Sequence, residues 1–130
     1  MKITEIRIGN WLYSLIPVVD KDGQTERHPV RVTGIRTDGG DLIQGDDTDA
    51  WYPMEAYEPI PITSDILTAN GFEDMGYFGK CETVGWKVLC DTKNVTVIHG
   101  DHTDLDIPAK YVHELQNALS QCRIDKQIKL

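Results

Sequence analysis

The stretch that decides the fold reads Pro59-Ile60-Pro61-Ile62-Thr63-Ser64-Asp65-Ile66-Leu67-Thr68-Ala69-Asn70-Gly71-Phe72. Its two prolines lack an amide hydrogen and keep the preceding residues extended, so the stretch begins as a stiff, non-helical segment. Thr63 has the hydroxyl of a helix N-cap, Asp65 suits the positive end of the helix, and Gly71 provides a left-handed stop. The stretch therefore predicts a short helix over 63–71. The kinds of secondary structure predicted before this helix differ from those predicted after it.

The residues before this helix predict short strands joined by acidic turns. Aromatic and β-branched residues fill 11–19, polar and apolar residues alternate over 30–36, and 41–44 is a shorter run of the same kind. The turn sequence at 20–23 predicts a hairpin between the first two of these strands. A further strand at the start of the chain is predicted from Ile3, Ile6 and Ile8. Strands of this size and spacing predict a small antiparallel barrel or rolled sheet.

The residues after the helix predict a β-meander and a second helix. Strands are expected at 77–78, 84–89 and 95–99, with turns at Gly79, at Gly85 and over 91–94. The second helix is predicted to begin at Ile107-Pro108, where a proline costs no hydrogen bond. Its apolar stripe is Tyr111, Val112, Leu115, Ala118, Leu119 and Cys122, and His113 is assigned to the opposite face. The predicted fold class is α+β, with Ile124, Ile128 and Leu130 as a final strand or packed tail.

Size, composition and charge limit the classes of function. The chain has 130 residues, 40% of them hydrophobic, and its formal net charge is -8. It holds no apolar run of the ~20 residues needed to span a bilayer, and no apolar signal segment follows Met1, so we expect a cytoplasmic protein and no membrane partner. The three widely spaced cysteines predict reduced thiols, and the acidic balance argues against nucleic acid as the partner.

One cluster has the residue types of a metal or acid–base site. Two histidines and three aspartates lie within residues 99–106, and His99, His102, Asp101 and Asp104 are its candidate ligands. Their spacing is not diagnostic, because an acidic turn that leads into a helix uses the same residue types. We favour a solvated turn and keep the metal or acid–base site as the alternative.

The rest of the sequence lacks a catalytic signature. Ser14, Ser64 and Ser120 are not in a nucleophile-elbow context, and no glycine-rich phosphate loop precedes either predicted helix. These patterns favour a protein that is not an enzyme, and no cofactor is predicted.

Aromatic residues are concentrated in the first half of the chain. The candidate binding residues are Trp11, Tyr13, Trp51 and Tyr52, with Tyr57 close to them in sequence. Small barrels recognise ligands on aromatic-lined surfaces, but they also need large side chains to fill the interior. We expect most of these rings to be interior, with one or two exposed, and the negative charge nearby favours a protein partner that carries basic residues.

Three blocks of the sequence resemble a known family. The blocks are Arg7-Ile8-Gly9-Asn10-Trp11-Leu12-Tyr13, then Pro59-Ile60-Pro61-Ile62-Thr63 with Ile66-Leu67 and Asn70-Gly71-Phe72, and Lys110-Tyr111-Val112-His113-Glu114-Leu115-Gln116-Asn117. In this order they resemble a family of small uncharacterised proteins of gut anaerobic bacteria and their phages or prophages. The resemblance implies an intracellular protein in a mobile-element setting and no known activity. It also implies an N-terminal half similar to an SH3-like β-barrel. We therefore predict an SH3-like barrel over residues 1–58 and an α+β segment of helix, β-meander and helix over 59–130, with one core shared by the two halves as the alternative to two separate cores.

These observations lead to one main hypothesis and two alternatives. The main hypothesis is a non-enzymatic accessory or adaptor protein of phage or prophage type that binds another protein. The first alternative is a metal-dependent or acid–base enzyme that uses the 99–106 turn. The second is nucleic-acid binding through a local basic strip formed by Arg27, Arg31 and Arg36. The apolar stripe of the second helix fits packing within the chain and packing against a second copy equally well.

Overall fold

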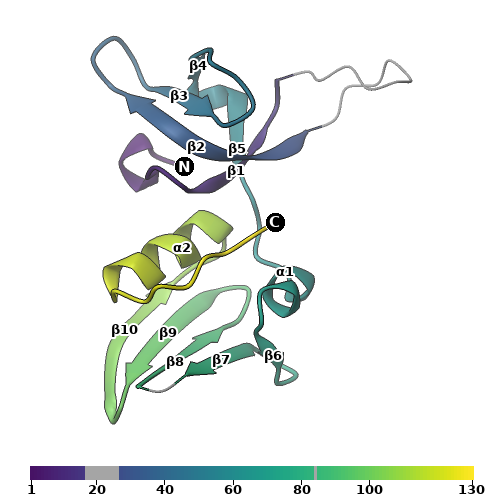
Figure 1. Cartoon of the computed structure of the whole chain (residues 1–130), viewed down its shortest axis with the longest axis vertical. Helices are drawn as coiled ribbons and strands as arrows, with labels where there is room; N and C mark the ends of the chain where they lie inside the picture. Colours follow the sequence, from purple (N-terminus) through teal and green to yellow (C-terminus); the bar gives the residue numbers. More distant parts are fainter. Residues whose placement is uncertain (17–26, 84) are drawn as a thin grey trace. The chain divides into compact units, whose positions relative to one another are not determined.

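The computed structural model describes residues 1–16, 27–83 and 85–130 (Figure 1). The chain divides into two compact units, Met1–Ile60 and Pro61–Leu130. Each unit contains one five-stranded antiparallel sheet, and both α-helices belong to the second unit. The predicted α+β class is therefore confirmed. None of the helices in the described part of the chain is long and apolar enough to cross a membrane.

The sheet of the first unit has the strand order β4-β3-β2-β1-β5. Its elements are η1 Ile3–Glu5, β1 Trp11–Ser14, β2 His28–Arg36, β3 Leu42–Gly45, β4 Tyr52–Pro53, η2 Met54–Ala56 and β5 Tyr57–Pro59. The first and last strands are neighbours, with Leu12 opposite Pro59. Strands β4 and β5 are the two edges, so the described strands do not form a closed barrel. The predicted turn at 20–23 lies outside the described residues.

The inner face of this sheet holds the core of the first unit. Alternation along β1 and β2 places Leu12 opposite Val30 on the inner face, and both are fully buried. The core cluster consists of Ile6, Leu12, Val30, Val32, Ile43 and Tyr57.

The predicted opening strand is wrong. The amides of Glu5 and Ile6 donate to the carbonyls of Lys2 and Ile3, which makes a 3₁₀ turn. The Asn10 side chain then accepts from the Arg7 amide (2.8 Å), so local bonds replace the sheet pairing that the apolar pattern predicts. Ile6 enters the core and Ile8 is 63% exposed, which is why the pattern of alternation fails.

The second unit is a meander whose strand order, β10-β9-β8-β7-β6, follows the chain. Its elements are α1 Ser64–Ala69, β6 Glu73–Asp74, β7 Gly79–Thr83, β8 Trp86–Cys90, β9 Asn94–His99, β10 His102–Pro108 and α2 Val112–Gln121. Figure 1 shows α2 lying across one face of this sheet. The core of this unit includes the buried aliphatic side chains of α2 and the strand residues Val88, Val95 and Val97.

Local signals correctly predict α1. Thr63 Oγ1 accepts from the Ile66 amide (3.2 Å), and Gly71 has a φ of 83°. The packed tail is confirmed for Ile124 and Ile128, which are buried, but it is wrong for Leu130, which is exposed at the end of the chain. Asn70 fixes the tail through both ends of its amide, accepting from the Lys129 amide and donating to the Lys129 carbonyl.

The predicted start of the second helix is wrong. Ile107 and Pro108 end β10, where Pro108 lies opposite Asn94. The helix begins at Val112, since the Glu114 carboxylate accepts from the amides of Lys110 (3.0 Å) and Tyr111 (3.2 Å) and caps it there.

Two further predictions in this unit need correction. Tyr77 and Phe78 lie in the loop between β6 and β7, and Gly79 is the first residue of β7 and not a turn. His113 is 1% exposed and stacks on Tyr111, so it is on the buried side of α2. The apolar stripe itself is confirmed, because Val112, Leu115, Ala118 and Leu119 are all buried.

Candidate functional site

The outer face of the first sheet carries aromatic rings that are covered by arginines. The guanidinium carbon of Arg31 lies 5.6 Å from the ring centroid of Trp11, and that of Arg27 lies 4.7 Å from the centroid of Tyr13. A third pair, Arg36 over Trp51, has a separation of 4.7 Å. Each pair is within the range of a cation–π interaction. We call these six residues, Trp11, Tyr13, Trp51, Arg27, Arg31 and Arg36, the aromatic–arginine face.

Strand register produces two of these pairs. Trp11 lies opposite Arg31 across β1 and β2, and the buried Leu12 points to the other side of the sheet. Tyr13 lies opposite Glu58 of β5, and Glu58 Oε2 accepts from Arg27 Nη1 at 3.0 Å. Arg27 is therefore held by an ion pair and a ring at the same time.

A glycine makes room for the third pair. A Cβ atom at Gly34 would lie 2.5 Å from the Trp51 ring, so only glycine permits this close packing. The six-membered part of the ring is the part nearest to Gly34, and Arg36 lies over the same ring. Tyr52, in contrast, packs against the core cluster. The expectation that most of the candidate aromatic residues are interior is wrong for Trp11, Tyr13 and Trp51, which are half-buried and outside that cluster.

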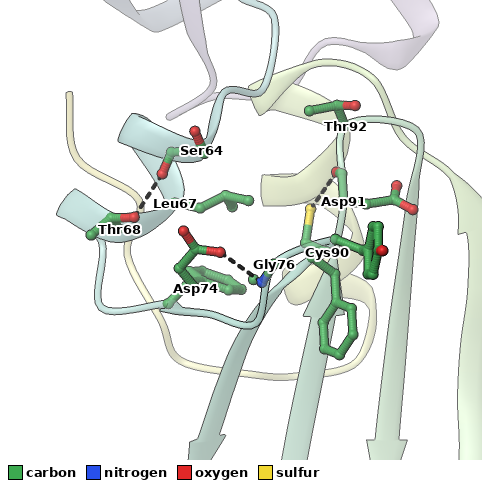
Figure 2. A pocket seen from close by; sticks show the side chains of 12 residues that line it. Ser64, Leu67, Thr68, Asp74, Gly76, Cys90, Asp91 and Thr92 are labelled. Carbon is green, nitrogen blue, oxygen red and sulfur yellow. Dashed lines mark hydrogen bonds between the residues drawn. The ribbon is translucent and has the colours of Figure 1, made fainter.

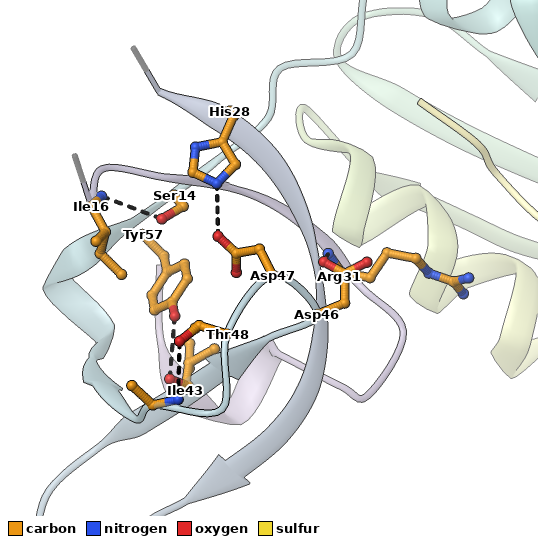
Figure 3. Close-up of polar contacts among 10 residues, drawn as sticks. Ser14, Ile16, His28, Arg31, Ile43, Asp46, Asp47, Thr48 and Tyr57 are labelled. Atoms are coloured by element: carbon orange, nitrogen blue, oxygen red, sulfur yellow. Dashed lines mark hydrogen bonds and ion pairs between the residues drawn. The ribbon is translucent and has the colours of Figure 1, made fainter. Parts of the chain in front are cut away.

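A polar cluster lies in the same unit where β1 ends and β2 begins (Figure 3). His28 Nε2 and Asp47 Oδ2 are 2.8 Å apart, and Ser14 is the cross-strand neighbour of His28. Ser14 is fully buried, and its Oγ accepts from the Ile16 amide at 3.3 Å. The cluster thus has the residue types of a hydrolytic triad, but its hydroxyl is shielded from solvent and used for a backbone contact.

Tyr57 belongs to this cluster as well. Its hydroxyl donates to the Ile43 carbonyl at 3.3 Å. Burial, followed by the nearby Asp47 carboxylate, raises the pKa of Tyr57 to about 12. The phenol is therefore neutral at ordinary pH and acts as a donor inside the core.

The predicted metal residues lie at the β9–β10 hairpin. His102 is opposite His99, Asp101 is in the turn, and His102 and Asp101 are exposed. His99 Nδ1 contacts Asp104 Oδ2. Among the residues that the structure describes, no three His, Cys, Asp or Glu side chains gather to hold a metal ion. The predicted solvated turn over 99–106 is wrong from His102 onward, because those residues pair with β9 as strand β10. The metal site stays a prediction, with His99 and Asp104 as its one contacting pair.

Sequence reasoning missed a pocket of about 150 Å³ in the second unit (Figure 2). We call it the α1 pocket, because α1, the β6–β7 loop and the end of β8 surround it. Its lining is Ser64, Leu67, Thr68, Phe72, Asp74, Gly76, Tyr77, Phe78, Gly79, Cys90, Asp91 and Thr92. The sequence feature that could have indicated this pocket is the aromatic pair Tyr77-Phe78 between two glycines. A strand predicts the same pair of residues, so the feature was not decisive.

The nucleophile types that line the α1 pocket are not activated. Burial, followed by the charge of Asp91, raises the pKa of the Cys90 thiol to about 12, so the sulfur is protonated at neutral pH. Its S–H donates to the Asp91 carbonyl at 3.2 Å. Thr68 Oγ1 donates to the Ser64 carbonyl at 2.8 Å, a bond within the helix. This arrangement suits the binding of a ligand better than a covalent step.

No family model, curated protein or solved structure matches this chain.

Proposed function

We propose that this protein is a non-enzymatic adaptor that binds another protein through the aromatic–arginine face. The observation that carries the proposal is the set of three arginines over three half-buried rings, outside the core of their unit. Tryptophan, tyrosine and arginine are the residues that dominate the binding energy of protein interfaces.

The geometry of the pairs lowers the entropic cost of binding. A free arginine loses considerable side-chain freedom when a partner fixes it. Arg27 is already restrained by Tyr13 and Glu58, and Trp51 is seated on Gly34. A partner therefore meets a surface that is largely organised before contact.

The charge of this face selects the chemistry of the partner. Its guanidinium groups suit planar carboxylates, which they bind in a bidentate manner. We therefore infer a partner that presents acidic side chains here, although the net charge of -8 suggests a basic partner for the rest of the chain.

The same geometry favours a protein over a nucleic acid. Single-stranded nucleic acids stack their bases on exposed aromatic rings. Here each ring already has a guanidinium group over it, at 4.7 to 5.6 Å from the centroid. A base would have to displace that group, whereas an acidic side chain can bind to it from outside.

The setting and the finer fold belong to the same proposal. The resemblance to proteins of gut anaerobes and their phages supports an accessory role in a mobile element. The order of the first sheet, with its first and last strands adjacent, supports an SH3-like barrel that is left open between β4 and β5.

The test is a capture experiment with variants chosen on this face. Tagged full-length protein is used on nuclease-treated lysate of the native host, and the recovered protein is then purified and its Kd measured. We expect Trp11→Ala and Trp51→Ala each to weaken binding at least about 30-fold. Arg31→Lys keeps the charge but loses the planar group, so we expect a smaller loss.

The matched control is Trp86→Ala, which removes a half-buried tryptophan of the second unit. Circular dichroism of each variant checks that the chain is folded. Retained affinity in folded Trp11→Ala and Trp51→Ala, or an equal loss in Trp86→Ala, would overturn the proposal. Strongly salt-dependent binding of the purified chain to added DNA or RNA, with no protein recovered from the lysate, would overturn it in favour of the basic-strip hypothesis.

A further inference from the structure

The α1 pocket has the size of a single side chain. Pockets for cofactors and drug-sized ligands measure roughly 300–1,000 Å³, whereas this one measures about 150 Å³. Leu67 and Phe72 are buried in its floor, and Phe78 is half-buried at its wall. A long side chain with an apolar stem fills such a space better than a short polar one.

The charged groups of the lining are all acidic. Among the described residues that line the pocket, Asp74 and Asp91 carry charge, and lysine, arginine and histidine are absent. Asp74 uses Oδ1 to accept from the Gly76 amide (2.8 Å), so its second oxygen can accept from a ligand. Figure 2 shows this carboxylate beside α1.

Asp91 contributes differently. Its Oδ1 accepts from the amides of Lys93 (2.7 Å) and Asn94 (2.6 Å), and in Figure 2 its side chain turns away from α1. It therefore adds negative potential and not a direct contact. An apolar floor with a carboxylate at the rim is complementary to an alkyl chain that ends in a cation.

The loop beside the pocket is unusually apolar for its exposure. Tyr77, which lines the pocket, is 95% exposed, and Met75, which lies between the lining residues Asp74 and Gly76, is 42% exposed. Exposed rings and methionines at the rim of a pocket are features of protein docking sites. We propose that the α1 pocket binds one lysine or arginine side chain of a partner polypeptide, whose backbone lies against the Met75–Phe78 loop. This inference goes beyond the proposed function, because it concerns another surface in the other unit.

The probes are blocked tripeptides, so no natural partner is needed. Gly-Lys-Gly, Gly-Arg-Gly and Gly-norleucine-Gly, acetylated and amidated, are titrated into the ¹⁵N-labelled full chain. Norleucine has the alkyl stem without the charge. We expect saturable shifts of the Leu67, Gly76 and Thr92 amides with the lysine or the arginine peptide, at an affinity about three- to tenfold higher than that of norleucine.

Two isosteric variants test the carboxylates, and a third is the control. Asp74→Asn keeps the Oδ1 that accepts from Gly76 and removes the charge, so it should abolish the preference for the cationic peptide. Asp91→Asn keeps its turn in the same way and should reduce the preference by a smaller factor. Asp125→Asn removes an exposed charge of the same unit outside the lining, and the preference should be unchanged.

Three results would overturn the inference. The first is no saturable shift at the pocket with either cationic peptide. The second is equal affinity for lysine, arginine and norleucine, which would make the site a plain apolar slot. The third is a preference that survives Asp74→Asn in a chain whose spectrum is otherwise unchanged. Because no captured partner is involved, failure here is distinguishable from failure of the aromatic–arginine face.

Discussion

The two units contain sheets of the same size that are stabilised in different ways. In the second unit the strands follow chain order, and α2 covers one face with aliphatic side chains. In the first unit the described residues form no α-helix, and the outer face is covered by its own rings and guanidinium groups. Side chains that replace a helix remain available to a partner. This contrast explains why the binding features lie on a strand face in one unit and beside a loop in the other.

The largest expected effect is a loss of stability at alkaline pH, which begins at a different pH in each of the two cores. The buried Cys90 has a pKa of about 12 against 9.0 for an ordinary thiol, and Tyr57 has a pKa of about 12 against 10.0. The unfolded chain loses these protons first, so the free energy of unfolding falls as pH rises. The loss begins near pH 9 for Cys90 and near pH 10 for Tyr57. At about pH 11 it amounts to up to about 3 kcal/mol for Cys90 and about 1 kcal/mol for Tyr57.

Urea unfolding between about pH 8 and about pH 11 measures this loss. Cys90→Ala should remove the part that begins near pH 9, and Tyr57→Phe the part that begins near pH 10. Both variants cost stability at neutral pH as well, since each truncates a buried side chain and removes its hydrogen bond. An unchanged pH dependence in both variants would show that neither group is held neutral by its core.

A substitution at Gly34 should give the next largest effect and tests the packing of the first unit directly. In Gly34→Ala the new Cβ would meet the Trp51 ring at 2.5 Å, so the ring must leave its place on β2. We expect a loss of about 1–3 kcal/mol in the free energy of unfolding and a shift of tryptophan fluorescence towards that of exposed indole. Gly39→Ala is the control, because no atom lies within 4 Å of a Cβ at that position. Equal stability of the two variants would contradict the close packing of Trp51.

Sequence patterns predicted the helices and helix ends correctly where the contacts that decide them are local. The cap of α1 depends on Thr63 and Ile66, and its end on Gly71, all within one short stretch. The stripe of α2 is likewise visible at helical spacing. The start of α2 is not visible in this way, because Ile107 and Pro108 pair with Val95 and Asn94 of β9, a pairing that the helix-start signal of a proline does not reveal.

The candidate sites show the same limit. The sequence identified Trp11, Tyr13 and Trp51 as candidate binding residues, and separately a possible basic strip. That the two sets form pairs depends on strand register and on the space above Gly34, neither of which the residue types reveal. The α1 pocket was missed because its walls come from three segments of the chain. In addition, a tyrosine at position 77 is compatible with a strand as well as with a loop.

The smallest expected effect concerns a single carboxylate at the edge of the first core. Asp47 raises the pKa of Tyr57, second in size to burial, and pairs with His28 Nε2 at 2.8 Å. Asp47→Asn keeps an oxygen that can accept from His28 and removes the charge, so the pKa of Tyr57 should fall while the fold is kept. The titration is followed by tyrosinate absorbance, with Tyr57→Phe to assign the signal and the exposed Asp49→Asn as the control. A lower pKa brings the folded value closer to the unfolded one, so the alkaline loss of stability should also shrink. If the pKa falls equally in Asp49→Asn, the general charge of the loop acts on Tyr57, and not the carboxylate that faces it.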